Sequence, residues 1–275
     1  MSEREKRSPI GDRASTAPRG VVAYEREGDV GSLVLNKPPL NLFDRELVDA
    51  LKEGVKKATA DGPRALLVRA EGKVFTGGVD VHEFDDLGGP AARAFAEELL
   101  ALTRSIEDLP FPTLAAVHGL CLTAGLELAL ACDLIWATES AKFGLVERVV
   151  GVTPFMGGTQ RMAERAGPAR AREFVYSGNP YPAAELERWG VINRVVADYE
   201  LMDSARKFAT HLAEGPPLAR AATKRIVRAQ ADGGTRAADS VTPDEAAGLF
   251  ESEDLKRAVK TFLSEGPGKA EFSGR

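Results

Sequence analysis

Cysteine and histidine are scarce in this sequence, with two cysteines and three histidines in 275 residues. Cys121 and Cys132 both lie in one apolar stretch, so we expect neither a disulfide framework nor a multi-cysteine metal site. His82, His118 and His211 lack the mutual spacing of a metal site. We therefore expect no bound metal, and the cysteine usage is typical of a protein from a reducing cytoplasm.

Long hydrophobic runs are also missing. The longest apolar stretch, Leu126–Ala137, is interrupted by Glu127 and Asp133. It is shorter than the roughly 20 apolar residues needed to cross a bilayer. The segment Met1–Arg7 is charged and lacks the apolar core of a secretory signal peptide. The sequence therefore predicts a soluble, cytoplasmic protein with no membrane partner.

An excess of positive charge is absent as well. The formal net charge is -5 and the pI is about 5.5, so there is no overall cationic field of the kind that drives binding to nucleic acid. We expect no nucleic-acid partner. Hydrophobic residues make up 44% of the chain, which suffices for the core of a globular protein.

The first half of the chain alternates between strand and helix patterns. Residues 1–18 are charged and small, and predict a disordered leader. Val21–Glu27 and Val30–Leu35 are β-prone and flank Gly28-Asp29, which predicts a hairpin. Asp44 is a suitable N-cap for a helix over residues 45–60, where apolar residues recur at a spacing of four.

Further along, two short apolar runs, Ala65–Arg69 and Leu114–Val117, suit buried strands. Between them, Ala91–Asp108 carries apolar residues on one helical face and ends before Pro110. Strands that alternate with helices indicate an α/β fold with largely parallel strands. We assign residues 19–198 to this core.

The pattern changes to helices alone from about residue 199. Three helices are expected over residues 200–213, 217–231 and 243–263, separated by Gly215-Pro216 and Gly233-Gly234. Residues 199–275 are therefore predicted to form a helical C-terminal region.

The first candidate for chemistry is the run Lys73–Asp80, which follows a predicted strand. Its pair Gly77-Gly78 lets the backbone turn sharply and brings N–H groups close to a ligand. A tight turn without a ligand is the alternative, because glycine pairs chiefly mark turns.

The second candidate is the run His118–Glu127, a strand end followed by small residues and an apolar stretch. A helix that opens there would expose unpaired N–H groups, suited to an oxyanion. An acidic residue in a first helical turn is also favoured by the helix dipole alone. However, Glu127 is flanked by leucines, so we expect it to be partly buried, with a raised pKa suited to acid–base chemistry.

The third candidate is Glu147, which follows Phe143-Gly144 and precedes a glycine-rich run up to Arg161. Taken alone, Glu147 could simply pair with Arg148 or Arg161 at the surface. Two glutamates, each beside a glycine-bearing loop, make a more specific pattern.

Four runs together resemble the enoyl-CoA hydratase/isomerase (crotonase) family in order and spacing. The resemblance covers most of the chain from about residue 21, and the runs are Asn36-Lys37-Pro38, Phe75–Asp80, His118–Asp133 and Phe143–Arg161. It implies a spiral of ββα units, a C-terminal helical region that supports trimerisation, and a homotrimer or hexamer. The implied substrate is an acyl-CoA thioester. Coenzyme A is then part of the substrate, and no separate cofactor is implied.

The resemblance also implies roles for individual residues. The backbone N–H groups of Val79 and Ala124 would form the oxyanion hole, and Glu127 and Glu147 would be the catalytic carboxyl groups. Five residues are implied for substrate binding: Gly77, Gly78, Asp80, Phe155 and Lys269, the last near the nucleotide phosphate.

The presence of both glutamates favours hydration of a 2,3-unsaturated acyl-CoA as the reaction, since many isomerases of the family lack one of the two. The sequence departs from the family at Thr123-Ala124-Gly125, where glycines are usual, at Val146 in place of proline, and at Phe155 in place of glycine. A phenyl ring at residue 155 could shift the reacting water or reshape the acyl pocket. Isomerisation, decarboxylation and non-catalytic acyl-CoA binding therefore remain as alternatives.

Overall fold

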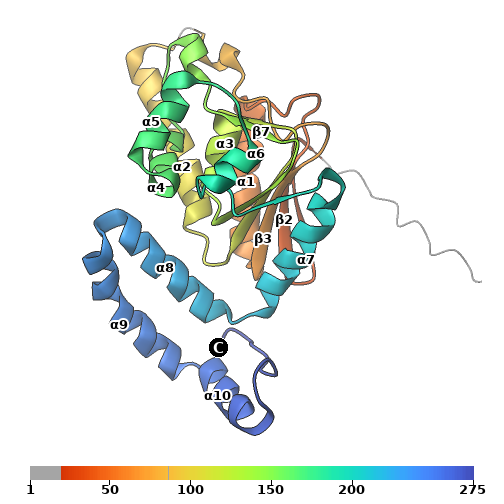
Figure 1. Ribbon diagram of the computed structural model, residues 1–275, viewed down its shortest axis with the longest axis vertical. Coiled ribbons are helices and arrows are strands. Elements are labelled where there is room, and N and C mark those ends of the chain that lie inside the picture. Colours follow the sequence, from red (N-terminus) through yellow and green to blue (C-terminus); the bar gives the residue numbers. More distant parts are fainter. Residues whose placement is uncertain (1–19, 86) are drawn as a thin grey trace, which may run out of the picture.

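The computed structural model describes residues 20–85 and 87–275. The predicted leader over residues 1–18 lies outside them. The molecule has two parts: sheets covered by helices form the upper part of Figure 1, and a series of helices extends below them. The N-terminal half builds most of the sheets, and the C-terminal quarter is helical.

The larger sheet has six strands, and its first two form the predicted hairpin. β1 (Val22–Glu27) pairs antiparallel with β2 (Val30–Leu35) across the Gly28-Asp29 turn. Every later neighbour in this sheet pairs in parallel, as expected when helices connect the strands. The strand order is β1-β2-β3-β4-β6-β9, where β3 is Ala65–Ala70, β4 is Thr113–Val117, β6 is Leu134–Thr138 and β9 is Arg194–Val196.

A smaller sheet of three strands lies beside the first. β5 (Leu120–Leu122) pairs in parallel with β7 (Lys142–Gly144), and β7 pairs antiparallel with the short β8 (Tyr181–Pro182). The chain therefore repeats a unit of one strand in each sheet followed by a helix. β4, β5 and α3 (Ala124–Leu130) form one such unit, and β6, β7 and α4 (Gly158–Ala166) form the next. This arrangement confirms the predicted α/β class.

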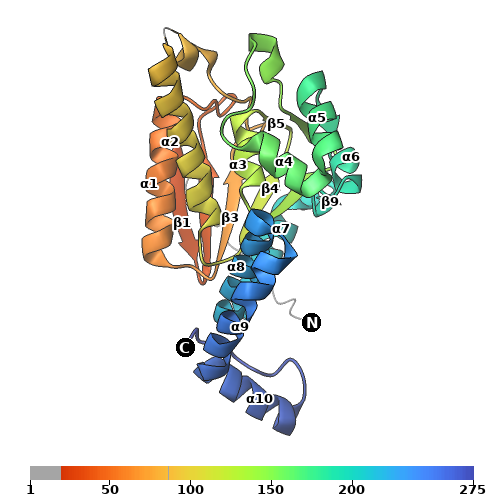
Figure 2. The same cartoon turned by 90° about the vertical axis from the view of Figure 1, so that its left-hand side faces the viewer.

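Two long helices cover the larger sheet, as the periodicity predicts. α1 (Arg45–Asp61) begins at Asp44, whose side chain accepts a hydrogen bond from Leu47 N at 3.0 Å. α2 (Gly89–Glu107) buries Phe95, Leu99, Leu102 and Ile106. Both helices lie on the same side of the sheet in Figure 2.

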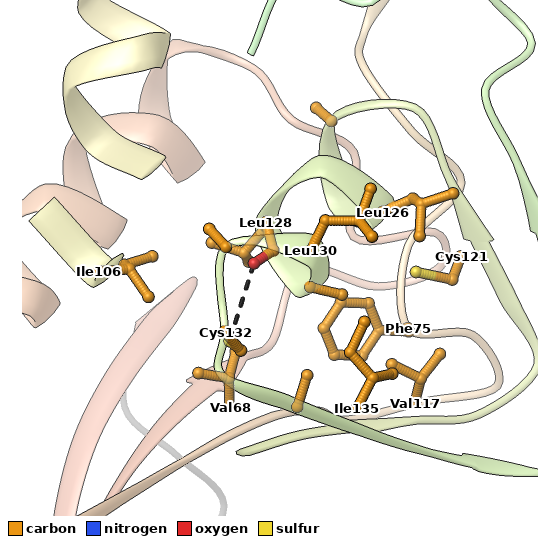
Figure 3. Close-up of a cluster of buried hydrophobic side chains, with 14 of the residues drawn as sticks. Val68, Phe75, Ile106, Val117, Cys121, Leu126, Leu128, Leu130, Cys132 and Ile135 are labelled. Atoms are coloured by element: carbon orange, nitrogen blue, oxygen red, sulfur yellow. Dashed lines mark hydrogen bonds between the residues drawn. The ribbon is translucent and has the colours of Figure 1, made fainter. Parts of the chain in front are cut away.

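The core surrounds the short helix α3. Leu126, Leu128 and Leu130 of α3 are all buried, and they lie on different sides of the helix among Phe75, Ile106 and residues of the neighbouring strands (Figure 3). Full burial of each leucine contributes about 1.5 to 3 kcal/mol. Cys132 is buried beside them, and its thiol donates to the Leu128 carbonyl. Because α3 is buried all round, it carries any polar side chain in its sequence into the protein interior.

The remaining short elements connect these units and complete the core. They are η1 (Val81–Phe84), η2 (Glu147–Val150), α5 (Pro168–Ser177), α6 (Ala183–Arg188) and η3 (Asp198–Glu200), where η marks a 3₁₀ helix.

Four helices follow, and one sequence-based boundary is wrong. The helices are α7 (Leu201–Glu214), α8 (Pro217–Gly233), α9 (Thr235–Glu251) and α10 (Glu253–Glu265). The helix predicted over residues 243–263 is in fact parts of two. Pro243 lies inside α9 instead of starting a helix, and Ser252 breaks the run by capping α10 at Leu255 N. Packing of α9 on α8, with Arg225 bonded to Glu245, overrides the local preference of proline.

The C-terminal helices lie at increasing distance from the sheets along the chain. α7 packs on the larger sheet, where Leu201 and Ala205 meet Trp136. The Lys224 ammonium of α8 contacts Asp133 at 2.9 Å, and α9 and α10 lie beyond, away from the sheets (Figure 2). In the described ranges, no helix combines the length and apolar character required to cross a bilayer.

Candidate functional site

Two segments that are distant in the sequence run side by side. The first follows β3 and contains Thr76, and the second contains β5 with Leu120 and Leu122. Thr76 N donates to Leu120 O at 2.9 Å, and Leu122 N donates to Thr76 O at 3.3 Å. The glycine pair and the start of α3 are thereby brought together.

Gly78 is required by this close approach. Its φ is +108°, a conformation that side chains rarely adopt, and a Cβ built there would lie 2.3 Å from Thr123 Oγ1. The sequence predicted that the glycine pair brings N–H groups close to a ligand, and this stays a prediction, although Gly78 does lie in close contact with another group. The group that approaches is a side chain of the protein itself.

The Thr123 side chain is hydrogen bonded to the backbone N–H of Val79, the first of the two amides predicted to form the oxyanion hole. Val79 N donates a hydrogen bond to Thr123 Oγ1 at 2.8 Å. Thr123 is the N-cap residue of α3, but its hydroxyl makes no capping bond to that helix. Its backbone has φ 44° and ψ -123°, which is unusual for a β-branched residue. Thr123 thus joins the two loops directly.

Ala124 is the first residue of α3, and its side chain is buried. The first N–H groups of an α-helix have no acceptor within the helix, so the Ala124 N–H is suited to an acceptor from outside α3. Val79 and Ala124 come together because Thr123, adjacent to Ala124 in the chain, is hydrogen bonded to Val79.

Glu127 lies one turn further along α3 and is 3% exposed. Its Oε1 accepts hydrogen bonds from Met156 N at 2.9 Å and Gly158 N at 2.8 Å. Gly158 fits closely, since a Cβ there would lie 2.7 Å from Glu127 Cγ. The turn before α4 therefore fixes one carboxylate oxygen and leaves the other available.

Glu147 begins η2 and is 5% exposed. Both of its carboxylate oxygens are buried, and neither has a hydrogen-bond partner among residues 20–85 and 87–275. The alternative of a surface ion pair is wrong. Arg148 instead donates to the Ser177 carbonyl, and Arg161 binds Glu107.

Burial dominates the electrostatics of this pair. Desolvation, with the nearby charge of Glu147, raises the pKa of Glu127 to about 8, against the effect of the two backbone donors. Desolvation raises the pKa of Glu147 to about 7. Since Glu147 shifts the pKa of Glu127, the two carboxyl groups titrate as a pair. Near neutral pH such a pair can both accept and donate a proton.

Comparison with known proteins decides the family. The model of the enoyl-CoA hydratase/isomerase family matches residues 25–274. The chain belongs to this family. It is 32% identical over 248 residues to a probable enoyl-CoA hydratase of Bacillus subtilis, covering 89% of this chain and 95% of that protein. It is 37% identical over 209 residues to a carnitinyl-CoA dehydratase of Salmonella enteritidis, covering 75% and 80%.

Solved structures agree with this family and its fold. A structure described as enoyl-CoA hydratase subunit I from Geobacillus kaustophilus matches with a TM-score of 0.87 and 33% identity, covering 93% of this chain and 98% of that one. A putative enoyl-CoA hydratase from Streptomyces coelicolor matches with a TM-score of 0.88 and 28% identity, covering 98% and 100%. The predicted crotonase-like spiral of ββα units is confirmed.

Two of the residues that the family resemblance implies for substrate binding serve the structure itself. Asp80 caps η1 by accepting from His82 N at 3.1 Å, and the His82 side chain lowers the pKa of Asp80. The half-buried ring of Phe155 packs against Phe84 at 5.7 Å and Phe95 at 6.1 Å between ring centroids. Phe155 also directly precedes Met156, which holds Glu127.

Lys269 does not lie near Glu127 and Glu147 of the same chain. It is exposed and lies in the segment after α10, at the opposite end of the molecule from α3 (Figure 2). That segment folds back on α10, where Ser273 N and Gly274 N donate to Asp254.

Sequence reasoning missed the contact of Thr123 with Val79. The signal available was the residue type, since a threonine stands where the family usually has glycine. The described residues contain no group of three His, Cys, Asp or Glu side chains placed to hold a metal ion.

Proposed function

We propose that this protein is an enoyl-CoA hydratase-type lyase, which adds water across the 2,3-double bond of an acyl-CoA thioester. The pair of buried glutamates carries the proposal. Within the described residues, neither carboxylate oxygen of Glu147 has a hydrogen-bond partner, and Glu127 Oε1 is held by two backbone N–H groups. Unpaired buried carboxyl oxygens are costly unless something else binds them, and a water with a substrate would meet that need.

The reaction requires stabilisation of negative charge. When water attacks C3 of the conjugated thioester, charge develops on the carbonyl oxygen as an enolate forms. Hydrogen-bond donors preorganised at that oxygen contribute several kcal/mol to lowering the barrier. We assign this role to the loop at Val79 and to the Ala124 N–H.

The reaction also requires two proton movements. The attacking water loses a proton, and C2 of the enolate gains one. Two carboxyl groups whose pKa values are raised to about 8 and about 7 by burial suit this exchange near neutral pH. Coenzyme A is part of the substrate, and the chemistry proposed needs no separate cofactor.

The names of the relatives support a reaction of this type. One is a probable enoyl-CoA hydratase and another a carnitinyl-CoA dehydratase, and dehydration is the reverse of hydration. The same oxyanion hole would also serve an isomerase or a decarboxylase, which share an enolate.

The test is turnover of crotonyl-CoA by the full chain and by Glu127→Gln and Glu147→Gln. Each substitution removes an acid–base group while keeping the shape, so turnover should fall about 10²- to 10⁴-fold. Glu139→Gln is the control, since Glu139 is exposed, and it should match the unmodified protein. Turnover that survives both active-site substitutions would contradict the proposal.

Product masses separate the alternatives. Hydration adds one water to the acyl-CoA, decarboxylation removes carbon dioxide, and isomerisation leaves the mass unchanged. A panel of acyl-CoA thioesters analysed by mass spectrometry therefore identifies the reaction. Binding of acetoacetyl-CoA without turnover of any thioester would favour a non-catalytic binding protein.

We also propose that the chain works in the cytoplasm as a homotrimer or hexamer, assembled through its C-terminal helices. The exposed apolar side chains of α10, among them Phe262 and Leu263, support an interface there, because such patches commonly mark contact sites. Light scattering after size-exclusion chromatography measures the mass directly.

A further inference from the structure

The Val79 N–H does not face an open oxyanion hole. Its acceptor is the Thr123 hydroxyl, at 2.8 Å, and Thr123 is only 6% exposed. A thioester oxygen cannot accept a short, direct hydrogen bond from Val79 while Thr123 Oγ1 holds that position. The side chain of Thr123 must therefore be part of how this site binds an oxyanion.

The conformation of Thr123 is costly for the protein. A β-branched residue with φ 44° and ψ -123° is rare, and such residues are found chiefly where the surrounding structure serves a function. Glycine would adopt this backbone without strain. The strained threonine places its hydroxyl against Gly78, where even one added carbon would collide.

The proton of the Thr123 hydroxyl is available for a further hydrogen bond. Thr123 Oγ1 accepts from Val79, and throughout the described part of the chain its own proton has no acceptor. A threonine at an N-cap normally accepts from its own helix, but Thr123 does not. A hydroxyl that accepts from an amide is polarised and becomes a stronger donor.

We propose that the Thr123 hydroxyl is itself an oxyanion-hole donor: it accepts from the Val79 N–H and donates its proton in a hydrogen bond to the thioester oxygen. The assignment rests on the proposed function, since it needs an enolate oxygen at this site. Val79 then acts through Thr123, and the Ala124 N–H acts beside it. No proton leaves Thr123, because the interaction is a hydrogen bond throughout.

A purely structural role for Thr123 is the alternative. In that case the hydroxyl only ties the two loops together, and substrate chemistry would not depend on its proton. Only the donor role stabilises the enolate oxygen. The test must therefore measure the pH at which a bound ligand becomes an enolate, as well as turnover.

Three substitutions test the donor. Thr123→Val keeps the shape and removes the hydroxyl, so kcat/KM for crotonyl-CoA should fall about 100-fold or more, as for other lost oxyanion donors. Thr123→Ser keeps the hydroxyl and should regain most of that loss. Thr123→Gly uncovers the Val79 N–H and should exceed Thr123→Val by about tenfold or more. Thr138→Val is the control, because within the described residues the hydroxyl of this buried threonine has only Ser140 Oγ as a hydrogen-bond partner, at 3.5 Å.

A second readout does not depend on turnover. Acetoacetyl-CoA forms an enolate that can be followed by ultraviolet absorbance, and donors at its oxygen lower the pH at which the enolate appears. With Thr123→Val this pH should rise by about 2 units, the same 100-fold loss expressed as a pKa change. Circular dichroism and thermal melting confirm that each variant is folded.

The outcomes distinguish this proposal from the proposed function. If Thr123→Val keeps its kcat/KM and its enolate pH, or if Thr123→Ser loses as much as Thr123→Val, the hydroxyl is not a donor. If no hydration is found but the enolate pH still depends on the Thr123 hydroxyl, the donor stands and the proposed reaction is wrong. If the unmodified protein neither turns over crotonyl-CoA nor forms the enolate of bound acetoacetyl-CoA at any pH, both proposals fail.

Discussion

Glu127 and Glu147 are both buried, but the rest of the protein holds their carboxyl groups differently. Glu127 Oε1 accepts from Met156 N and Gly158 N, whereas the two carboxylate oxygens of Glu147 have no hydrogen-bond partner within residues 20–85 and 87–275. The charge of Glu147 raises the pKa of Glu127, so the two groups are close enough to interact. One carboxyl group is therefore fixed by backbone, and the other depends on a ligand or water.

The pH dependence of turnover follows from this pair. Burial raises the pKa of Glu127 to about 8 and that of Glu147 to about 7. Activity should need one proton on the pair, so kcat/KM should be bell-shaped, with its maximum between about pH 7 and 8. Initial rates with crotonyl-CoA over about pH 5 to 10 measure the profile. A rate that stays constant between about pH 6 and 9 would contradict a shared proton.

Stability should also depend on Glu147. Its pKa is raised in the folded state, so the folded protein keeps this proton at a pH where the unfolded chain releases it. The raised pKa therefore lowers the free energy of unfolding. This loss of stability is absent below the ordinary glutamate pKa and grows as pH rises toward about 7. Glu147→Gln removes it. We expect the variant to gain about 1 to 3 kcal/mol more in unfolding free energy at about pH 8 than at about pH 5.

Urea unfolding of both proteins at the two pH values measures this difference. Exposed Glu139→Gln is the matched control and should show no such gain. An equal effect of Glu147→Gln at both pH values would mean that this carboxyl group is not protonated on folding.

The position of Glu127 should depend on Gly158. Gly158→Ala adds a carbon that would lie 2.7 Å from Glu127 Cγ, so the carboxyl group must move. A displacement of this size can lower turnover about 10²-fold. Gly248→Ala is the control, because no atom lies within 4 Å of the added carbon. Normal turnover by folded Gly158→Ala would show that the position of Glu127 is not critical.

Phe155 should limit the length of the acyl chain. Its ring packs with Phe84 and Phe95 beside the turn that holds Glu127. Phe155→Ala opens space there, and each additional buried CH₂ contributes about 0.8 kcal/mol. The ratio of kcat/KM for 2-hexenoyl-CoA over crotonyl-CoA should therefore rise about tenfold. Phe250→Ala, at an exposed position, serves as the control, and an unchanged ratio would place the acyl tail elsewhere.

Local physical rules accounted for much of the fold. Asp44 begins α1 because its side chain caps the helix, and the hairpin forms at Gly28-Asp29. These features depend on residues close in the sequence. Pro243 shows the limit of such rules, since contacts between α8 and α9 keep it inside a helix.

The candidate site shows the same division. By itself the sequence determined the alternation of strands and helices, the resemblance to the family, and the burial of Glu127, because each follows from neighbouring residues or from the order of motifs. Only the tertiary structure decided that Glu147 lacks an arginine partner and that Thr123 covers the Val79 N–H. Both depend on segments distant in the chain that meet only after the sheets have packed, and no periodicity in the sequence records such contacts.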